Sequence, residues 1–138
     1  MKRKLILCVD DEKVILSSLI EQLQHGLGNQ FLYEIAQSAE EAWEIIEDLQ
    51  NEIEMVLIIS DWLMPGMKGD EFLIRLHEKY PEVVTIMLTG QADESSIKNA
   101  IEHANLYACL RKPWDKDDLI HNIKTALKMY NKMTNELD

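Results

Sequence analysis

The sequence predicts a single α/β domain in which a parallel sheet is covered by helices on both faces. Short apolar runs alternate with segments of helical periodicity along the whole chain, which is the pattern of parallel strands joined by crossover helices. Several of the runs are almost unbroken, as expected for strands that are buried on both faces. The length of 138 residues suits one domain, and a chain of this size buries roughly 68–70% of its unfolded surface without needing a disulfide or a metal.

Five apolar segments are the expected strands. Residues 5–9, 55–59 and 83–88 are nearly unbroken hydrophobic runs, so they are expected to be covered by helices on both faces. Residues 33–37 alternate between apolar and polar side chains, and residues 107–110 form a weaker run. These two segments are therefore expected to be the edge strands.

Helical periodicity follows each expected strand. A capping box formed by Ser38 and Glu41 precedes the second helix, and Pro81 ends the third. The fourth helix carries the thinnest apolar stripe, and the fifth is the longest. The stripes are Val14, Leu19, Leu23 and Leu27; Ala39, Ala42, Trp43, Ile46 and Leu49; Phe72, Leu73, Leu76 and Tyr80; Ile97, Ala100, Ile101 and Ala104; and Leu119, Ile120, Ile123, Leu127 and Tyr130.

The composition excludes several classes of protein. The apolar fraction is 46% and the charged fraction 28%, which are ordinary values for a globular protein and argue against disorder. The formal net charge is -11, and a surface of this sign repels nucleic-acid phosphates and anionic lipid headgroups. We therefore expect neither direct nucleic-acid binding nor docking on a membrane.

The cysteines and the first residues bear on cellular location. Cys8 and Cys109 lie in apolar runs, and without a CxxC motif or a Cys/His cluster they are expected to be small hydrophobic residues rather than redox or ligand residues. The chain begins Met-Lys-Arg-Lys and continues with a run of five apolar residues, which is too short for a signal-peptide core or a membrane span. Both features fit a reducing cytoplasm.

Polar side chains follow four of the expected strands at the point where each strand ends. In open α/β sheets, ligands bind beyond the carboxyl ends of the strands, so these residues are the candidates for a functional site. They are Asp10, Asp11 and Glu12 after the first strand; Ser60 and Asp61 after the third; Thr89 and Gly90 after the fourth; and Arg111, Lys112 and Pro113 after the fifth.

The chemistry of these residues favours a cation and a phosphoryl group. Clustered carboxylates repel one another unless a cation lies between them, and Mg²⁺ prefers one or two carboxylates together with phosphate oxygens. Lys112 and Thr89 can complete a phosphate cradle, the lysine as a point charge and the threonine as a hydrogen-bond donor. An aspartate beside them, such as Asp61, can act as a nucleophile toward phosphorus.

Each residue also has a plainer structural interpretation. Asp10 or Asp11 can cap the following helix, and Asp61 can form a turn. Thr89 is at a common type of strand exit, and Lys112 can lie in a solvated loop. These interpretations become improbable jointly, because all four groups fall at the carboxyl ends of strands and none at the opposite ends.

Four motifs follow one another along the chain: Asp10-Asp11, Asp61-x-x-Met64-Pro65-Gly66-x-x-Gly69, Thr89-Gly90 and Lys112-Pro113. Together they resemble the signature of response-regulator receiver domains, and the resemblance runs from about residue 4 to residue 130. It implies a single (βα)5 doubly wound domain over residues 1–130, with a five-stranded parallel sheet in the flavodoxin-like order 2-1-3-4-5. Residues 131–138 are then a C-terminal tail or the start of a linker to an output domain.

The resemblance implies how the acidic residues act. Asp61 should be the phosphoacceptor. Asp11 should bind Mg²⁺ directly, together with Asp61 and the backbone carbonyl of Leu63, while Asp10 should contribute through water.

The resemblance implies further roles on the far side of the acceptor. Lys112 should pair with the acyl phosphate, and Thr89 should move to hydrogen-bond it. The Lys112-Pro113 peptide should be cis, which proline permits at modest cost. The remaining implied contributions are the shaping of a loop by Pro65 and Gly69, and control of the phosphoryl lifetime by Leu63 and Gln91.

The resemblance also implies partners. The donor should be a sensor histidine kinase, a phosphotransfer protein or a small acyl phosphate, and the signal should pass to a downstream target or a fused output domain. Beyond its own phosphorylation and dephosphorylation the chain should not be an enzyme. Homodimerisation through the fourth helix, fifth strand and fifth helix is common in the family. The Lys112-Pro113-Trp114-Asp115 run resembles a subgroup often fused to cyclic-dinucleotide phosphodiesterase or other signalling domains.

One position departs from the family pattern. Three residues before the lysine, the family usually has an aromatic residue that is coupled to the movement of the threonine, and this chain has Cys109. The nearest aromatic residue is Tyr107, which is two positions earlier and is therefore expected to point the same way as Cys109. Either Tyr107 substitutes imperfectly or the coupling to the output differs.

Two other functions stay open at this point. A phosphatase with an aspartate nucleophile would need that nucleophile on the first strand and a second acid two residues on; here Asp10 is followed by Asp11, Glu12 and Lys13. A receiver-like interaction module that is never phosphorylated usually lacks an acidic residue or the lysine, and all are present. Nucleotide-binding enzymes are disfavoured because the chain has neither GxGxxG nor GxxxxGK[ST].

Overall fold

The computed structural model describes residues 2–64, 66, 67, 69–90, 94–104 and 106–134. Strands and helices alternate, all four strand pairs are parallel, and the strand order is β2-β1-β3-β4-β5. The predicted fold class and strand order are therefore confirmed. The elements are β1 (Arg3–Val9), α1 (Lys13–Leu27), β2 (Leu32–Ala36), α2 (Ala39–Leu49), β3 (Ile53–Asp61), α3 (Gly69–Lys79), β4 (Val84–Thr89), α4 (Glu94–His103), β5 (Leu106–Arg111) and α5 (Lys116–Thr134).

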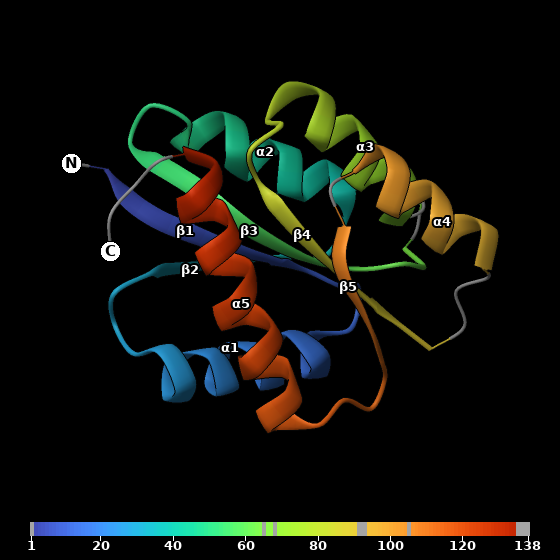
Figure 1. The fold of residues 1–138 in the computed structure, drawn as a ribbon, viewed down its shortest axis with the longest axis horizontal. Helices are drawn as coiled ribbons and strands as arrows, with labels where there is room; N and C mark the ends of the chain where they lie inside the picture. Colours follow the sequence, from blue (N-terminus) through green and yellow to red (C-terminus); the bar gives the residue numbers. More distant parts are fainter. Residues whose placement is uncertain (1, 65, 68, 91–93, 105, 135–138) are drawn as a thin grey trace.

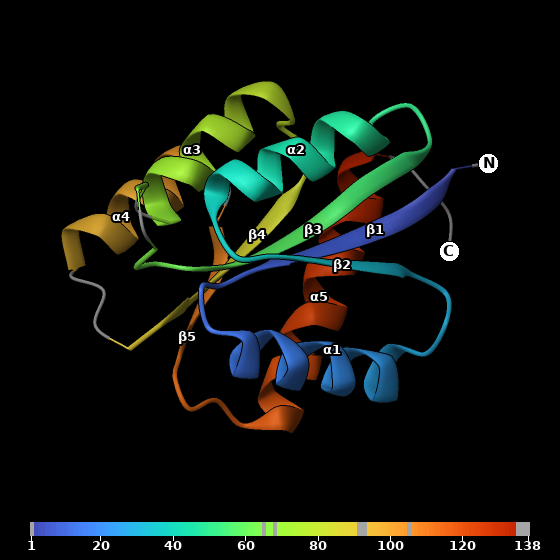
Figure 2. The same ribbon diagram turned by 180° about the vertical axis from the view of Figure 1, so that it is seen from behind.

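Helices cover both faces of the sheet. Helices α1 and α5 lie on one face, and α2, α3 and α4 lie on the other (Figure 1, Figure 2). An apolar cluster fills each of the two interfaces, and burial of this kind contributes about 25 cal/mol for each Å² of apolar surface removed from water. Strands β2 and β5 are the edges, as predicted. The α1/α5 cluster includes Leu16, Leu19, Leu23, Leu119 and Ile123, and the α2/α3/α4 cluster includes Ala42, Ile46, Phe72, Leu76 and Ala100.

Val14 corrects the predicted apolar stripe of α1. Its side chain is 78% exposed. The buried face of α1 is formed by Leu16, Leu19, Leu23 and Leu27, which follow one another at intervals of three and four residues. Val14 lies two positions before Leu16, about 200° around the helix axis, so its side chain points away from the sheet.

Helix α4 is anchored by small side chains. Ala100 and Ala104 are fully buried, whereas Ile101, which the sequence placed in the same stripe, is 55% exposed. The thin stripe predicted for this helix is therefore even thinner in the structure. Among the described side chains of α4, only Ala100 is buried and Ile97 is half-buried, while Ala104 directly follows the helix. The helix therefore buries little apolar surface, which favours low local stability.

The pairing of β4 with β5 overturns the expected orientation of Tyr107. Thr85 pairs with Leu106 but Ile86 pairs with Ala108, so Tyr107 is an extra residue in β5. Such a bulge breaks the alternation of side chains along a strand. Cys109 packs against the α2/α3/α4 cluster, whereas Tyr107 packs against the α1/α5 cluster. The two side chains lie on opposite faces of the sheet, and Tyr107 does not substitute for an aromatic residue at position 109.

Both cysteines are free thiols. Cys8 is fully buried, and burial raises the pKa of its thiol to about 12. Cys109 is half-buried, and burial raises the pKa of its thiol although Arg111 acts in the opposite direction. Neither side chain favours the reactive thiolate, in agreement with their interpretation as small hydrophobic residues.

Helix α5 continues to Thr134, past residue 130, where the receiver domain was expected to end. Lys4 Nζ donates a hydrogen bond to Asn131 Oδ1 (3.3 Å), and the Tyr130 hydroxyl donates one to Glu54. Residues 135–138 lie outside the described residues, so the division between residues 130 and 131 stays a prediction. Among the helices of the described residues, none combines the length and the hydrophobicity that a membrane span requires.

The predicted cap of α2 is present. Ser38 Oγ accepts a hydrogen bond from Glu41 N at 3.1 Å. The return bond of the capping box goes to the neighbouring residue, because Glu41 Oε2 accepts from Gln37 N at 3.4 Å. The side chain of Ser38 therefore satisfies one of the amides at the start of the helix that have no partner within it.

We expect Ser38→Ala to lower the free energy of unfolding by about 1 kcal/mol, because it removes the acceptor for that amide. Urea denaturation measures the change. Ser17→Ala, at an exposed position within α1, is the matched control and should cost less. Equal losses in the two variants would show that the cap contributes nothing.

Candidate functional site

The carboxyl ends of four strands meet at one edge of the sheet. Asp10 follows β1, Asp61 is the last residue of β3, Thr89 is the last residue of β4, and Lys112 follows β5. The structure thus brings together the residues that the sequence singled out. Asp61, Thr89 and Lys112 line a cavity of about 580 Å³, and Asp10 lies directly before the lining residue Asp11. Its lining residues are Asp11, Glu12, Asp61, Trp62, Leu63, Met64, Thr89, Gly90 and Lys112.

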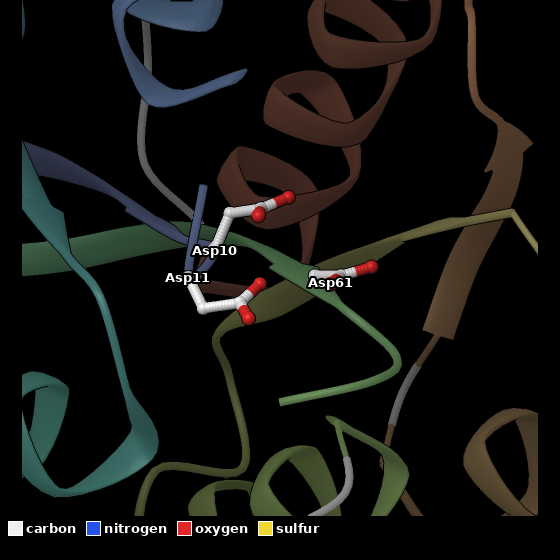
Figure 3. A group of neighbouring side chains, drawn as sticks. All are labelled: Asp10, Asp11 and Asp61. Carbon is white, nitrogen blue, oxygen red and sulfur yellow. The ribbon is translucent and has the colours of Figure 1, made fainter. Parts of the chain in front are cut away.

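Three carboxylates are clustered at this edge. One carboxylate oxygen from each of Asp10, Asp11 and Asp61 lies within 4.8 Å of the other two. Figure 3 shows the side chains of Asp10 and Asp11, which follow β1, beside that of Asp61 at the end of β3. Asp10 is 0% exposed and Asp61 5% exposed, whereas Asp11 is exposed. Because like charges repel more strongly where water is excluded, the cluster requires positive charge beside it.

Lys112 supplies part of that positive charge. Its Nζ lies 2.7 Å from Asp10 Oδ2 and 3.2 Å from Asp61 Oδ1, and its side chain is only 17% exposed. A single ammonium group therefore bridges the two buried carboxylates. Its charge balances only one of the three acids, so the cluster keeps a net negative charge.

Backbone hydrogen bonds fix the residues that carry these charges. Lys112 N donates to Thr89 O at 2.9 Å, and the Lys112-Pro113 peptide is cis, as expected. Asp10 Oδ1 accepts from Glu12 N at 2.9 Å, two residues along the chain. This local turn is distinct from a helix cap, because the N-cap of α1 is Glu12 and it has no side-chain capping bond.

The environment shifts the pKa of both members of the buried pair. Burial, and next the negative charge of Asp10, raise the pKa of Asp61 above its ordinary value, although Lys112 acts in the opposite direction. Burial acts to lower the pKa of Lys112, but its hydrogen bonds and charge interactions with Asp10 and Asp61 outweigh this and raise it. Lys112 is therefore firmly protonated. At Asp61 the charge of Lys112 does not fully offset the effects of burial and of Asp10, so the ionised carboxylate is disfavoured.

The donor set fits a hard divalent cation. Asp10, Asp11 and Asp61 offer carboxylate oxygens, which are the ligands that Mg²⁺ prefers. The group borders an open cavity, which leaves room for waters and for phosphate oxygens. A second positive charge here would relieve the repulsion that raises the pKa of Asp61.

The other predicted residues are placed as follows. Thr89 lines the cavity and is buried, and Leu63 lines it with an exposed side chain. Gly69 is the first residue of α3. Pro65 and Gln91 lie outside the described residues, so their expected roles stay predictions.

Two features of the site were not predicted. Trp62 lines the cavity directly after Asp61, and its backbone amide donates to Leu88 O at 2.9 Å. In the sequence, its position next to an acidic residue at the end of a strand was the feature that could have indicated this. The second is the bond of Lys112 to Asp10, since the sequence suggested only a phosphate partner for this lysine. Lys112 and Asp10 are 102 positions apart along the chain, so no local sequence pattern indicates their contact.

Comparison with known proteins places the chain in a family. Residues 6–124 match the family model of the response regulator receiver domain. The hydrogenase transcriptional regulatory protein HoxA of Cupriavidus necator is 32% identical over 127 residues, which are 92% of this chain and 25% of HoxA. The chain therefore spans about a quarter of the length of this curated relative.

Solved structures agree with the family match. The signal receiver domain of an HD domain-containing protein from Pseudomonas fluorescens Pf-5 is 31% identical, with a TM-score of 0.85 and coverage of 99% of this chain and 96% of that chain. A CheY-like response regulator receiver domain protein from Methanospirillum hungatei JF-1 is 32% identical, with a TM-score of 0.83 and coverage of 94% and 98%. Because the family model matches residues 6–124, which are most of the chain, the chain belongs to the response regulator receiver domain family.

Proposed function

We propose that this protein is a phosphorylation switch of two-component signalling in which Asp61 accepts the phosphoryl group. The observation that carries the proposal is the position of Asp61: its buried carboxylate borders the cavity, with Lys112 Nζ 3.2 Å away and two further carboxylates beside it. Receiver domains interact with histidine kinases. The donor is therefore a sensor histidine kinase or a phosphotransfer protein.

The transfer is a displacement at phosphorus. A carboxylate oxygen of Asp61 attacks the phosphorus of a phosphohistidine, an O–P bond forms, and the P–N bond breaks with its electron pair passing to the imidazole nitrogen. Such reactions need positioning and neutralisation of charge more than further covalent groups. Hydrolysis of the resulting acyl phosphate restores Asp61, so the chain undergoes phosphorylation and dephosphorylation without a catalytic activity on other substrates.

The acidic cluster would hold Mg²⁺, the ion that receiver domains bind at an acidic pocket. Asp11, Asp61 and the backbone carbonyl of Leu63 would bind it directly, and Asp10 would contribute through water. When bound, the ion supplies positive charge to the phosphoryl oxygens. The net negative charge of the cluster favours its binding.

Lys112 and Thr89 would hold the product. Lys112 would exchange its contact with Asp10 for a phosphoryl oxygen, a short movement for a flexible side chain that already touches Asp61. The Thr89 hydroxyl, at the end of the neighbouring strand, would donate a hydrogen bond to another phosphoryl oxygen. Both residues would then interact with phosphorylated Asp61 more strongly than with the free carboxylate.

The signal would leave through the strand that carries Thr89 and the helix that follows. Helix α4 is held by few apolar contacts, which suits an element whose position changes when a dianionic group binds nearby. The surface of α4, β5 and α5 would control a downstream partner or an output domain, and is also the proposed face of a homodimer. An output domain linked to residues 131–138 fits a relative such as HoxA, of which this chain spans 25%. We place this switch in the cytoplasm.

We expect wild-type protein incubated with Mg²⁺ and labelled acetyl phosphate to take up one phosphoryl group per chain, and Asp61→Asn to take up none, because the amide is not a nucleophile. Removal of Mg²⁺ with EDTA should abolish labelling. Asp48→Asn, at an exposed position on α2, is the control and should label normally. Equal labelling of Asp61→Asn, or no labelling of the wild type, contradicts the proposal.

We also expect Asp61→Asn to raise the melting temperature of the metal-free protein at pH 7 by about 2–6 °C. The folded protein binds a proton at Asp61 more tightly than the unfolded chain, whose ordinary pKa is 3.8, so ionised Asp61 destabilises the fold above its raised pKa. This rise in melting temperature should become smaller as the pH falls toward 4. At pH 7, addition of Mg²⁺ should also make it smaller. Thermal unfolding beside Asp48→Asn tests this; a lower melting temperature for Asp61→Asn would refute it.

Thr89→Ala should still bind beryllofluoride, because Asp61 and the acidic cluster are intact, but should lose the coupled change in α4. Amide hydrogen exchange of residues 94–103 with and without beryllofluoride measures the coupling. Thr125→Ala on α5, which also removes one threonine hydroxyl, is the control. An undiminished response of α4 in Thr89→Ala would rule out a threonine-driven switch.

A further inference from the structure

The connection between β5 and α5 is fixed at three points. Lys112 N donates to Thr89 O at 2.9 Å. The indole Nε1 of Trp114 donates to Gln22 Oε1 at 2.8 Å. Asp115 Oδ2 accepts from Asp118 N at 3.0 Å and so caps α5. Of these three bonds, only that of Trp114 reaches α1, the helix that begins directly after the acidic residues that follow β1.

The surroundings of Trp114 favour a fixed arrangement. Its half-buried ring packs against the α1/α5 cluster, which restricts its rotation. Gln22 is also half-buried, and its Nε2 donates to Ser18 Oγ at 3.4 Å, which orients the amide. A hydrogen bond between two groups that are already restrained costs little further entropy.

Close packing of α1 on α5 brings the two groups within reach. A Cβ atom at Gly26 would lie 2.6 Å from Ile120 Cδ1, so only glycine allows the present approach of the helices without a shift of Ile120. Gly26 is one helical turn beyond Gln22, and Ile120 lies in the second turn of α5. The two helices are therefore in close contact one turn from Gln22.

We propose that Trp114 and Gln22 are positioning residues for Lys112, an inference that rests on the proposed function for its catalytic consequence. Lys112 Nζ lies 2.7 Å from Asp10 Oδ2 and 3.2 Å from Asp61 Oδ1. Because the reach of the side chain is limited, keeping both contacts depends on where the backbone at residue 112 is held. Trp114 is two residues further on, and its bond to Gln22 ties this backbone to α1. The same helix follows Asp10, so the bond links the two sides of the site.

Phosphoryl transfer requires that the amine of Lys112 be held in the correct position. Lys112 must touch Asp61 before transfer and a phosphoryl oxygen afterwards, and small misplacements of such groups slow a reaction considerably. Loss of one neutral hydrogen bond corresponds to about a twofold to tenfold change in rate or in local accessibility. Both Trp114→Phe and Gln22→Leu remove the bond while keeping most of the apolar contact, so their effects should be similar and the double variant should be no worse.

The first experiment needs no phosphorylation. Reductive methylation followed by mass spectrometry measures the reactivity of each lysine amine. Lys112 should react about twofold to tenfold faster in Gln22→Leu and Trp114→Phe than in the wild type, while exposed Lys116 is unchanged. Gln24→Leu, which alters an exposed amide on the same helix, is the control. Unchanged reactivity of Lys112 in both variants overturns the proposal, even if their melting temperatures fall.

The second experiment measures the rate of phosphorylation by acetyl phosphate. The maximal rate should fall about twofold to tenfold in both variants, while the Mg²⁺ concentration for half-saturation stays the same because no carboxylate is altered. Gln22→Glu keeps an acceptor for the indole and should restore the rate, whereas a purely structural role would show only in thermal unfolding. A full rate in both variants overturns the catalytic part. If the wild type takes up no phosphoryl group, the proposed function fails, and the methylation result alone decides the positioning of Lys112.

Discussion

The ammonium group of Lys112 bridges two buried carboxylates, Asp10 and Asp61, that would otherwise repel each other in a place with little water. Removing charges from water is costly unless they are paired. The two ion pairs that Lys112 makes with Asp10 and Asp61 therefore hold together the carboxyl ends of β1 and β3 and the connection after β5. The single charge of Lys112 balances only one of the three clustered carboxylates, so the site keeps a net negative charge that favours a cation.

The parallel sheet makes this arrangement possible. In parallel strands all carboxyl ends point to one edge, and the crossover helices that cover both faces exclude water from the sheet. Asp61 is the final residue of a strand that is almost wholly buried, so the core behind it contributes to the desolvation of its carboxylate. The same burial raises its pKa and strengthens its contact with Lys112. The ionisation of Asp61 is thus tied to the packing of the core behind it.

The sequence predicted the features that follow from local rules. Apolar runs, helical stripes and polar residues at strand ends were enough for the fold class, the edge strands and the meeting of Asp10, Asp61, Thr89 and Lys112. Val14 was misplaced because a stripe that begins at a helix start has no earlier turn to fix its phase. The bonds of Lys112 to Asp10 and of Trp114 to Gln22 join residues 102 and 92 positions apart, and only the folded chain reveals such pairs.

The bulge in β5 was equally invisible, because one extra residue leaves no mark on a short apolar run. Its consequence for signalling is specific. Tyr107 is the only aromatic residue of β5, and it packs on the α1/α5 side, whereas α4 covers the opposite face, where Cys109 packs. Rotation of an aromatic ring on β5 therefore cannot carry a movement of Thr89 to α4. In the switch proposed above, a change at Thr89 would therefore reach α4 without an aromatic residue of β5, since Thr89 ends β4 and α4 is the next helix along the chain.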